Sequence, residues 1–291
     1  MTNKSSLASS SVWLKRPQSL ALVGFLLASA GTAPAASLGL NFVDNSNGGV
    51  QDGASDALGG AEIAGVPGYA QANWNNLGRW GATVGLKDNT GAATGVTTTW
   101  DSNNTWQMGA GSGSGDNKLM HGYIDATGQA NVNGSPYQFW WNENKPEVWL
   151  TGLTGWLSGQ GAASYNVVVY SDGDANEGRI GEYWLQAASA GDPPTLLGSD
   201  LTSHVFLRDS ANFSGAFTQV PLSADSLANA ADGNYIVFTG LTADGFILRT
   251  EEQSFRAQIN GLQIIGVVPE PGTMVLLGMG GLAVLLARRR R

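Results

Sequence analysis

YNVVVY, at residues 165–170, is the stretch that decides the fold, because it joins β-branched and aromatic side chains in one short run. Such side chains favour the extended backbone of a strand. Adjacent strand residues point to opposite faces, and here both faces carry apolar side chains. The sequence therefore predicts a central strand at 165–170, buried on both sides. By contrast, the one-sided pattern of VTTTW at 96–100 predicts an outer strand.

Similar short runs recur along the chain between clusters of Gly, Asn, Asp and Ser, and no segment sustains a 3.6-residue apolar period. Strands are predicted at 38–43, 82–86, 96–101, 119–124, 147–153, 165–171, 179–188, 204–208, 216–220, 234–240, 245–250 and 257–267. A short helix of at most two turns fits 223–231. This pattern predicts an all-β domain built as a two-sheet β-sandwich, of which the jelly roll is one form.

The composition excludes several classes of function. The 291 residues include 23 acidic and 15 basic side chains, so the chain offers no basic face for nucleic acid. The absence of cysteine excludes disulfides and thiolate metal ligands. Two histidines, His121 and His204, are too few for a metal site built on histidine alone.

The N-terminus has the layout of a secretory signal peptide. Basic residues precede the apolar run LALVGFLLASA at 20–30, and the small residues APA follow at 33–35. Eleven apolar residues are too few to span a bilayer. We therefore predict a signal peptide over residues 1–35, cleaved near Ala35, and export of the remaining chain.

The C-terminus combines a short motif, an apolar run and a block of arginines. Pro269, Glu270 and Pro271 precede TMVLLGMGGLAVLLA at 273–287. The terminal block consists of Arg288, Arg289, Arg290 and Arg291. As a helix the apolar run would rise about 22 Å, which is short of a hydrocarbon core about 30 Å thick, although snorkelling arginines extend its reach. The positive-inside rule would hold the arginines in the cytoplasm and leave the preceding domain outside.

This order of features resembles the PEP-CTERM sorting signal of exported bacterial proteins, over about the last 25 residues. The resemblance implies recognition by an exosortase, a membrane transpeptidase-like enzyme, and a link to extracellular polysaccharide. It gives a predicted organisation of signal peptide 1–35, exported β-sandwich 36–267 and sorting tail with a transmembrane helix 268–291. An ordinary C-terminal membrane anchor is the alternative, but it needs no Pro-Glu-Pro. We expect a protein of the cell envelope or extracellular matrix, transiently anchored in the inner membrane by its tail.

One loop carries a candidate calcium site. Asp172, Asp174 and Asn176 follow a D-x-D-x-N spacing, which can turn three oxygen ligands toward one cation. Without the two terminal signals, the domain keeps 8 basic and 22 acidic side chains, and this acidic balance also favours divalent cations. The match to a calcium loop is partial, because Glu177 occupies the position of the usual glycine. A hairpin turn rich in Asp and Gly is the competing interpretation.

The aromatic residues suggest a carbohydrate contact. Indole rings stack on the apolar faces of sugars, although a tryptophan is more often buried for its large apolar area. Trp140 and Trp141 are the best candidates, because adjacent strand residues face opposite sides and one ring would stay at the surface.

No catalytic motif is recognisable in the sequence. Glu143 and Glu147 would lie about 13 Å apart on a strand, beyond the usual separation of glycosidase carboxylates. We therefore predict a non-enzymatic protein with a structural or adhesive role in the extracellular polysaccharide. A carbohydrate-binding module is the alternative, and a glycoside hydrolase is the third candidate.

Overall fold

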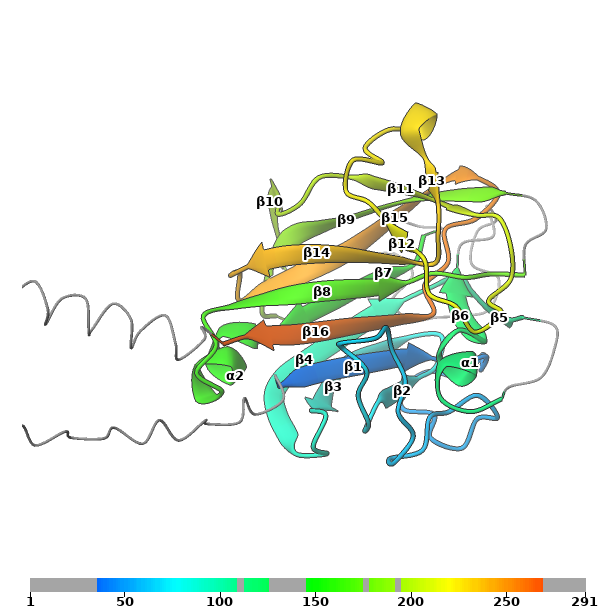
Figure 1. Ribbon diagram of the computed structural model, residues 1–291. Helices are drawn as coiled ribbons and strands as arrows, with labels where there is room; N and C mark the ends of the chain where they lie inside the picture. The colour runs from blue at the N-terminus through cyan, green and yellow to red at the C-terminus, as the bar shows by residue number, and fades with distance from the viewer. Residues whose placement is uncertain (1–35, 109–112, 126–144, 175–177, 192–194, 269–291) are drawn as a thin grey trace, which may run out of the picture. The chain divides into compact units, whose positions relative to one another are not determined.

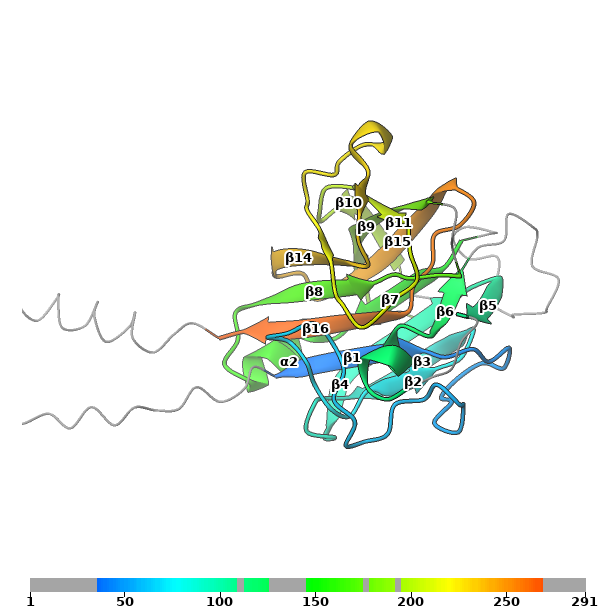
Figure 2. The same ribbon diagram turned by 45° about the vertical axis from the view of Figure 1, so that its right-hand side comes forward.

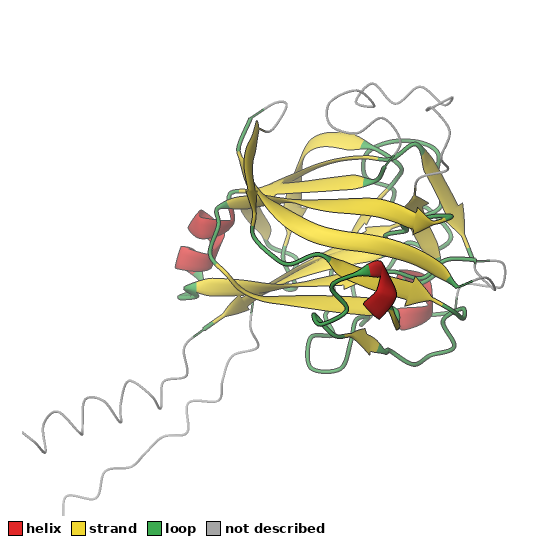
Figure 3. Ribbon diagram, turned by 90° about the horizontal axis from the view of Figure 1, so that it is seen from above, coloured by secondary structure: helices red, strands yellow, loops and turns green. Residues whose placement is uncertain are grey.

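The computed structural model describes residues 36–108, 113–125, 145–174, 178–191 and 195–268. Strands dominate these residues, and their two large sheets stack as layers (Figure 3). The prediction of an all-β sandwich is confirmed. The predicted signal peptide and the predicted tail helix at 273–287 lie outside the described residues. Within those residues, no helix is long and apolar enough to cross a membrane.

The smaller sheet has six strands. In spatial order they are β12 (Gln219–Val220), β14 (Tyr235–Leu241), β8 (Ser164–Tyr170), β16 (Gly261–Val267), β1 (Ser37–Phe42) and β2 (Asn75–Leu77). β8 pairs antiparallel with β14 and β16, so its predicted central position is confirmed. Val167 and Val169 face the core between the sheets, whereas Val168 and Tyr170 pack into a second apolar cluster. Both faces of YNVVVY are thus buried.

The larger sheet has eight strands. Its path runs β13 (Ala231–Asp232), β11 (Val205–Asp209), β9 (Arg179–Ser189), β15 (Gly245–Ser254), β7 (Glu147–Thr151), β4 (Ala93–Asp101) and β3 (Gly81–Lys87), with β10 (Thr195–Asp200) paired to β9. β4 lies between β7 and β3, so the outer position predicted for residues 96–100 is wrong by one strand. A separate pair, β5 (Asn104–Gln107) and β6 (Gly122–Asp125), lies beside the start of β16 (Figure 2).

The core fills the space between the two large sheets. Alternate residues of each strand point into it, as Tyr183 and Leu185 of β9 do. Trp100 of β4 is fully buried, and its Nε1 donates to the carbonyl oxygen of Gly78 at 2.8 Å. Its ring lies over Gly81, where a Cβ atom would come within 2.3 Å of the indole. A glycine in β3 is therefore what allows this indole to lie flat against the sheet.

Two predicted strands are interrupted by short helices. Residues 119–124 were expected to be extended, but α1 (Asp116–Leu119) precedes β6. Residues 147–153 were also expected to be extended, but β7 stops at Thr151 and α2 (Leu153–Gly159) follows. Gly152 has a φ of +87°, a left-handed conformation that turns the chain out of the sheet.

Two other boundaries differ from the prediction. Only Gln219–Val220 is a strand within 216–220, and β16 begins at Gly261 and not at 257. The segment 223–231 contains a single 3₁₀ turn at Leu227–Asn229, in keeping with the short length available to it. Such differences arise because pairing partners, which are distant in sequence, decide where a strand stops.

The two ends of the sandwich differ in what they carry. β1 begins where β16 ends, with Ser37 opposite Ile265 and the Gly266 amide donating to the Ala36 carbonyl oxygen at 2.9 Å. We call this the tail end, and α2 lies there (Figure 1). At the opposite end β8 and β11 finish and β9 begins. We call it the network end, because charged side chains meet there.

Candidate functional site

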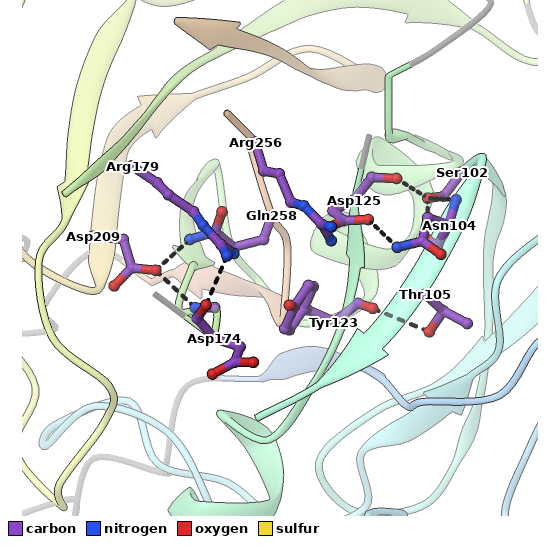
Figure 4. A network of polar contacts seen from close by, with 11 residues as sticks. Ser102, Asn104, Thr105, Tyr123, Asp125, Asp174, Arg179, Asp209, Arg256 and Gln258 are labelled. Atoms are coloured by element: carbon purple, nitrogen blue, oxygen red, sulfur yellow. Dashed lines mark hydrogen bonds and ion pairs between the residues drawn. The ribbon is translucent and has the colours of Figure 1, made fainter. Parts of the chain in front are cut away.

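The network end gathers five charged side chains from segments far apart in the sequence. Asp125 ends β6, Asp172 follows β8, and Asp209 ends β11, while Arg179 begins β9 and Arg256 follows β15. The three carboxylates are buried, with 0%, 0% and 2% of their surface exposed. Figure 4 shows all of these residues except Asp172. Such buried charges require paired charges or hydrogen bonds to be tolerated.

One carboxylate is fully matched by its neighbours. Arg256 Nη1 lies 2.6 Å from Asp125 Oδ2, and Asn104 Nδ2 donates to Asp125 Oδ1 at 2.8 Å. Burial raises the pKa of Asp125, while the Arg256 guanidinium acts in the opposite direction. Asp125 and Arg256 therefore form a hydrogen-bonded ion pair that closes one side of the network.

The other two carboxylates face each other. The Phe213 amide donates to Asp172 Oδ2 at 2.7 Å, and the Gly173 amide donates to Asp209 Oδ2 at 2.9 Å. The Gly173 bond brings the Asp209 carboxyl group next to the residue that directly follows Asp172. Burial raises the pKa of Asp172 well above its usual range, and the Asp209 carboxylate adds to the effect. Burial also raises the pKa of Asp209.

Several polar atoms around this pair have no hydrogen-bond partner among the described residues. Asp172 Oδ1 and Gln258 Oε1 are buried and unpartnered, although Gln258 Nε2 donates to Asp209 Oδ2 at 2.7 Å. Arg179 Nη2 donates to the Asp174 carbonyl oxygen at 2.7 Å, and its Nε and Nη1 have no partner. At Gly173 a Cβ atom would lie 3.1 Å from the Gln258 amide, so a side chain there would crowd the site.

The structure places the predicted calcium ligands only in part. Asp172 is buried and Asp174 is exposed, and Asn176 lies outside the described residues. Asp209, which the sequence did not single out, is the carboxylate that meets Asp172. It lies 37 positions further along the chain, and its location at a strand end is the one local feature that could have identified it. Within the described ranges, no group of three or more His, Asp or Glu side chains is arranged to hold a metal ion.

The predicted sugar contacts, Trp140 and Trp141, lie outside the described residues. Most other tryptophans serve packing, as expected for single indoles. The buried ones are Trp74, Trp100, Trp149, Trp156 and Trp184, whereas Trp106 of β5 is 53% exposed.

A cleft opens on the outer face of the smaller sheet. It has a volume of about 520 Å³ and is lined by residues of β12, β14 and the segment before β2. Its polar groups include Tyr69, Gln219, Tyr235 and Thr239, and Val237 contributes an apolar surface. Burial, and then the nearby Tyr69, raise the pKa of Tyr235. Two tyrosine rings with amide and hydroxyl groups give the cleft both stacking surfaces and hydrogen-bonding groups.

The candidate catalytic groups lie in separate places. Glu147 of β7 is buried and its Oε1 accepts a bond of 2.9 Å from Arg249 Nη2, while Glu143 lies outside the described residues. His121 lies 3.7 Å from Asp56, next to β6. His204 stacks on Trp184, with ring centroids 4.5 Å apart.

Comparison with known proteins identifies the C-terminal segment. Residues 267–291 match the PEP-CTERM protein-sorting motif, which marks exported proteins that are sorted to the cell envelope. The chain therefore carries a PEP-CTERM sorting motif at its C-terminus, and this motif supports an exported protein that is sorted by an exosortase. No curated protein and no solved structure matches the chain.

Proposed function

We propose that this protein is a surface or matrix component that associates with extracellular polysaccharide in a structural or adhesive role, and that it performs no catalysis. The observation that carries the proposal is the junction between the domain and its tail. β16 ends at Val267, where the matched motif begins, and Val267 pairs with Ser164 of β8. The sorting tail thus continues directly from an interior strand of the smaller sheet. A domain held in this way presents its network end and its outer faces to the surrounding polymer.

The sorting step can be tested with changes in the tail alone. Replacing Pro269, Glu270 and Pro271 by alanine should leave export intact and block the final processing, because the N-terminal signal would drive translocation and the tail would drive sorting. The precursor should accumulate in the membrane fraction with an unchanged domain. Val50→Ala, at an exposed residue outside the matched motif, is the control and should be processed normally. Release of the triple variant at the normal mature size would contradict an exosortase-dependent step.

The polysaccharide association is tested by co-sedimentation of the processed protein with the extracellular polysaccharide of the producing organism. We expect the protein to sediment with the polymer and to stay in solution after enzymatic digestion of that polymer. Sedimentation that is unaffected by the digestion would show self-association and would refute the proposal. Normal sorting without any sedimentation would leave an envelope protein with no role in the polymer.

A carbohydrate-binding module is the second candidate, and the cleft at Tyr69 and Tyr235 favours it. A sugar ring could stack on either tyrosine while Gln219 and Thr239 bond its hydroxyls. Affinity electrophoresis in a panel of polysaccharide gels should then retard the protein on one polymer. Tyr235→Ala should abolish the retardation, whereas Leu197→Ala, an exposed apolar residue outside the cleft, should not. No retardation on any polymer would remove this candidate.

A further inference from the structure

The charges at the network end do not balance. Asp125, Asp172 and Asp209 are three buried carboxylates, and the guanidinium groups near them among the described residues are those of Arg179 and Arg256. Arg256 is engaged by Asp125, which leaves Arg179 as the cation near the Asp172–Asp209 pair. Two neighbouring carboxylates in a buried site cannot both stay ionised unless a further positive charge is present. Either a shared proton or a bound cation must supply that charge.

The oxygen atoms around the pair favour a cation. Asp172 Oδ1 is buried and accepts no hydrogen bond from the part of the chain that the structure describes, although Asp172 Oδ2 is held by the Phe213 amide. Gln258, which is 1% exposed, leaves its Oε1 without a donor while its Nε2 bonds Asp209. A buried acceptor without a donor is costly, and a cation satisfies several such oxygens at once. A proton shared by the two carboxyl groups would still leave Gln258 Oε1 without a hydrogen-bond donor.

We propose that Asp172 and Asp209, together with the Gln258 side-chain oxygen, form a calcium-binding site between the loops at the network end. The donors are all oxygen atoms, two charged and one neutral, which is the ligand chemistry of hard divalent cations. Calcium suits the site better than magnesium, because it accepts irregular geometry and completes its shell with backbone carbonyls and water. With two carboxylates the site belongs among weak, extracellular calcium sites, with dissociation constants of about 0.1 to 1 mM.

This ligand set differs from the one that the loop sequence suggests. The D-x-D-x-N pattern places Asp174 beside Asp172 as a ligand, but the Asp174 side chain is exposed and its carbonyl oxygen accepts from Arg179. The site proposed here joins the β8–β9 loop to the end of β11 and to the segment before β16. Calcium would therefore fasten three segments of the network end, which are distant in sequence.

The test is a melting series on the purified full-length chain, stripped with a chelator and titrated with CaCl₂ to about 10 mM. Mass action predicts that saturating calcium raises the melting temperature by about 3 to 10 °C. Asp209→Asn and Asp172→Asn keep the shape of the carboxylate and its contact with a backbone amide, and each should lose the calcium-dependent rise. Asp174→Asn is the matched control and should retain it.

Calorimetric titration of the unmodified chain gives a second measurement that does not depend on the variants folding. We expect one calcium per chain and weaker binding of magnesium. An absence of both binding heat and a melting shift would overturn the proposal and assign a shared proton to the pair. A calcium-dependent rise that is lost in Asp174→Asn but kept in Asp209→Asn would also overturn it, in favour of the loop alone.

Discussion

The tail end and the network end of the sandwich solve different problems with different side chains. At the tail end, Tyr165 stacks on Phe246 with ring centroids 6.1 Å apart, and Leu157 of α2 packs beside Gly266 near the end of β16. At the network end, three buried carboxylates and two partly exposed arginines lie beside the apolar core.

This difference indicates which end of the domain should be stable without matched charges and which end should respond to pH and to bound cations. Apolar contacts are non-directional and need no partner ion, so the contacts at the tail end do not depend on a matched charge. Buried charges depend on matched partners, and their balance changes with pH and with bound cations. The part of the domain next to the sorting tail is therefore expected to be the more robust of the two.

The largest effect is expected from an apolar truncation at the tail end. Phe246→Ala removes a fully buried ring and leaves a cavity, so the free energy of unfolding should fall by about 3 to 5 kcal/mol. Chemical denaturation measures this change. Leu197→Ala, at an exposed residue of β10, should change it by less than about 0.5 kcal/mol. Equal effects of the two substitutions would remove the apolar half of the comparison.

A smaller loss is expected from breaking the ion pair at the network end. Arg256→Met leaves Asp125 buried without its counter-charge, and the cost should be about 2 to 3 kcal/mol, moderated because Arg256 is partly exposed. Lys118→Met breaks the more exposed bond to Glu62 and should cost at most about 1 kcal/mol. Adding Asp125→Asn to Arg256→Met should recover part of the loss. Recovery of none would show that packing, and not charge, was removed.

The outer face of the larger sheet carries a buried acid that should make stability depend on pH. Burial raises the pKa of Glu147 to about 8 despite the opposing Arg249. The folded state then holds a proton that the unfolded state has released, so stability should fall as pH rises from about 4.5 to about 8. Glu147→Gln should reduce the loss of unfolding free energy across this pH range by at least about 1 kcal/mol, as measured by denaturation at several pH values. An unchanged slope would place the titration elsewhere.

The smallest effect is expected at the one tryptophan that the described residues leave largely exposed. Trp106→Ala in β5 should change the free energy of unfolding by less than about 0.5 kcal/mol, because its ring keeps little apolar surface from water. Trp100→Ala is the buried reference, and denaturation of both variants gives the comparison. A large loss at Trp106 would mean that further residues cover its ring.

The sequence alone predicted those features of the fold that depend on the side chains within a single strand. The stretch YNVVVY identified β8 as central because both of its faces are apolar. The neighbours of β4 could not be read from VTTTW, because the chain reaches them only through distant pairing. The left-handed conformation of Gly152 could not be predicted, because the sequence does not specify which of its many glycines adopt a positive φ.

For the same reason, the sequence predicted only one of the three residues of the candidate site. Asp172 was selected by its spacing to Asp174, whereas its partner is brought by the pairing of β11 with β9. Gln258 lies just before β16, and the pairing of β16 with β8 likewise determines its position. Spacing reports neighbours along the chain, and this site is made of neighbours across the sheets.

The place of β16 between β8 and β1 also decides how the domain would respond to mechanical load. Hydrogen bonds run perpendicular to antiparallel strands, and β16 is bonded along its length on both sides. A pull on the tail, directed along β16, would load these bonds in shear, so that they share the force and do not open one after another. A tail joined to an edge strand, by contrast, could be peeled away. A load applied at the end of β16 would thus pass into the middle of a sheet.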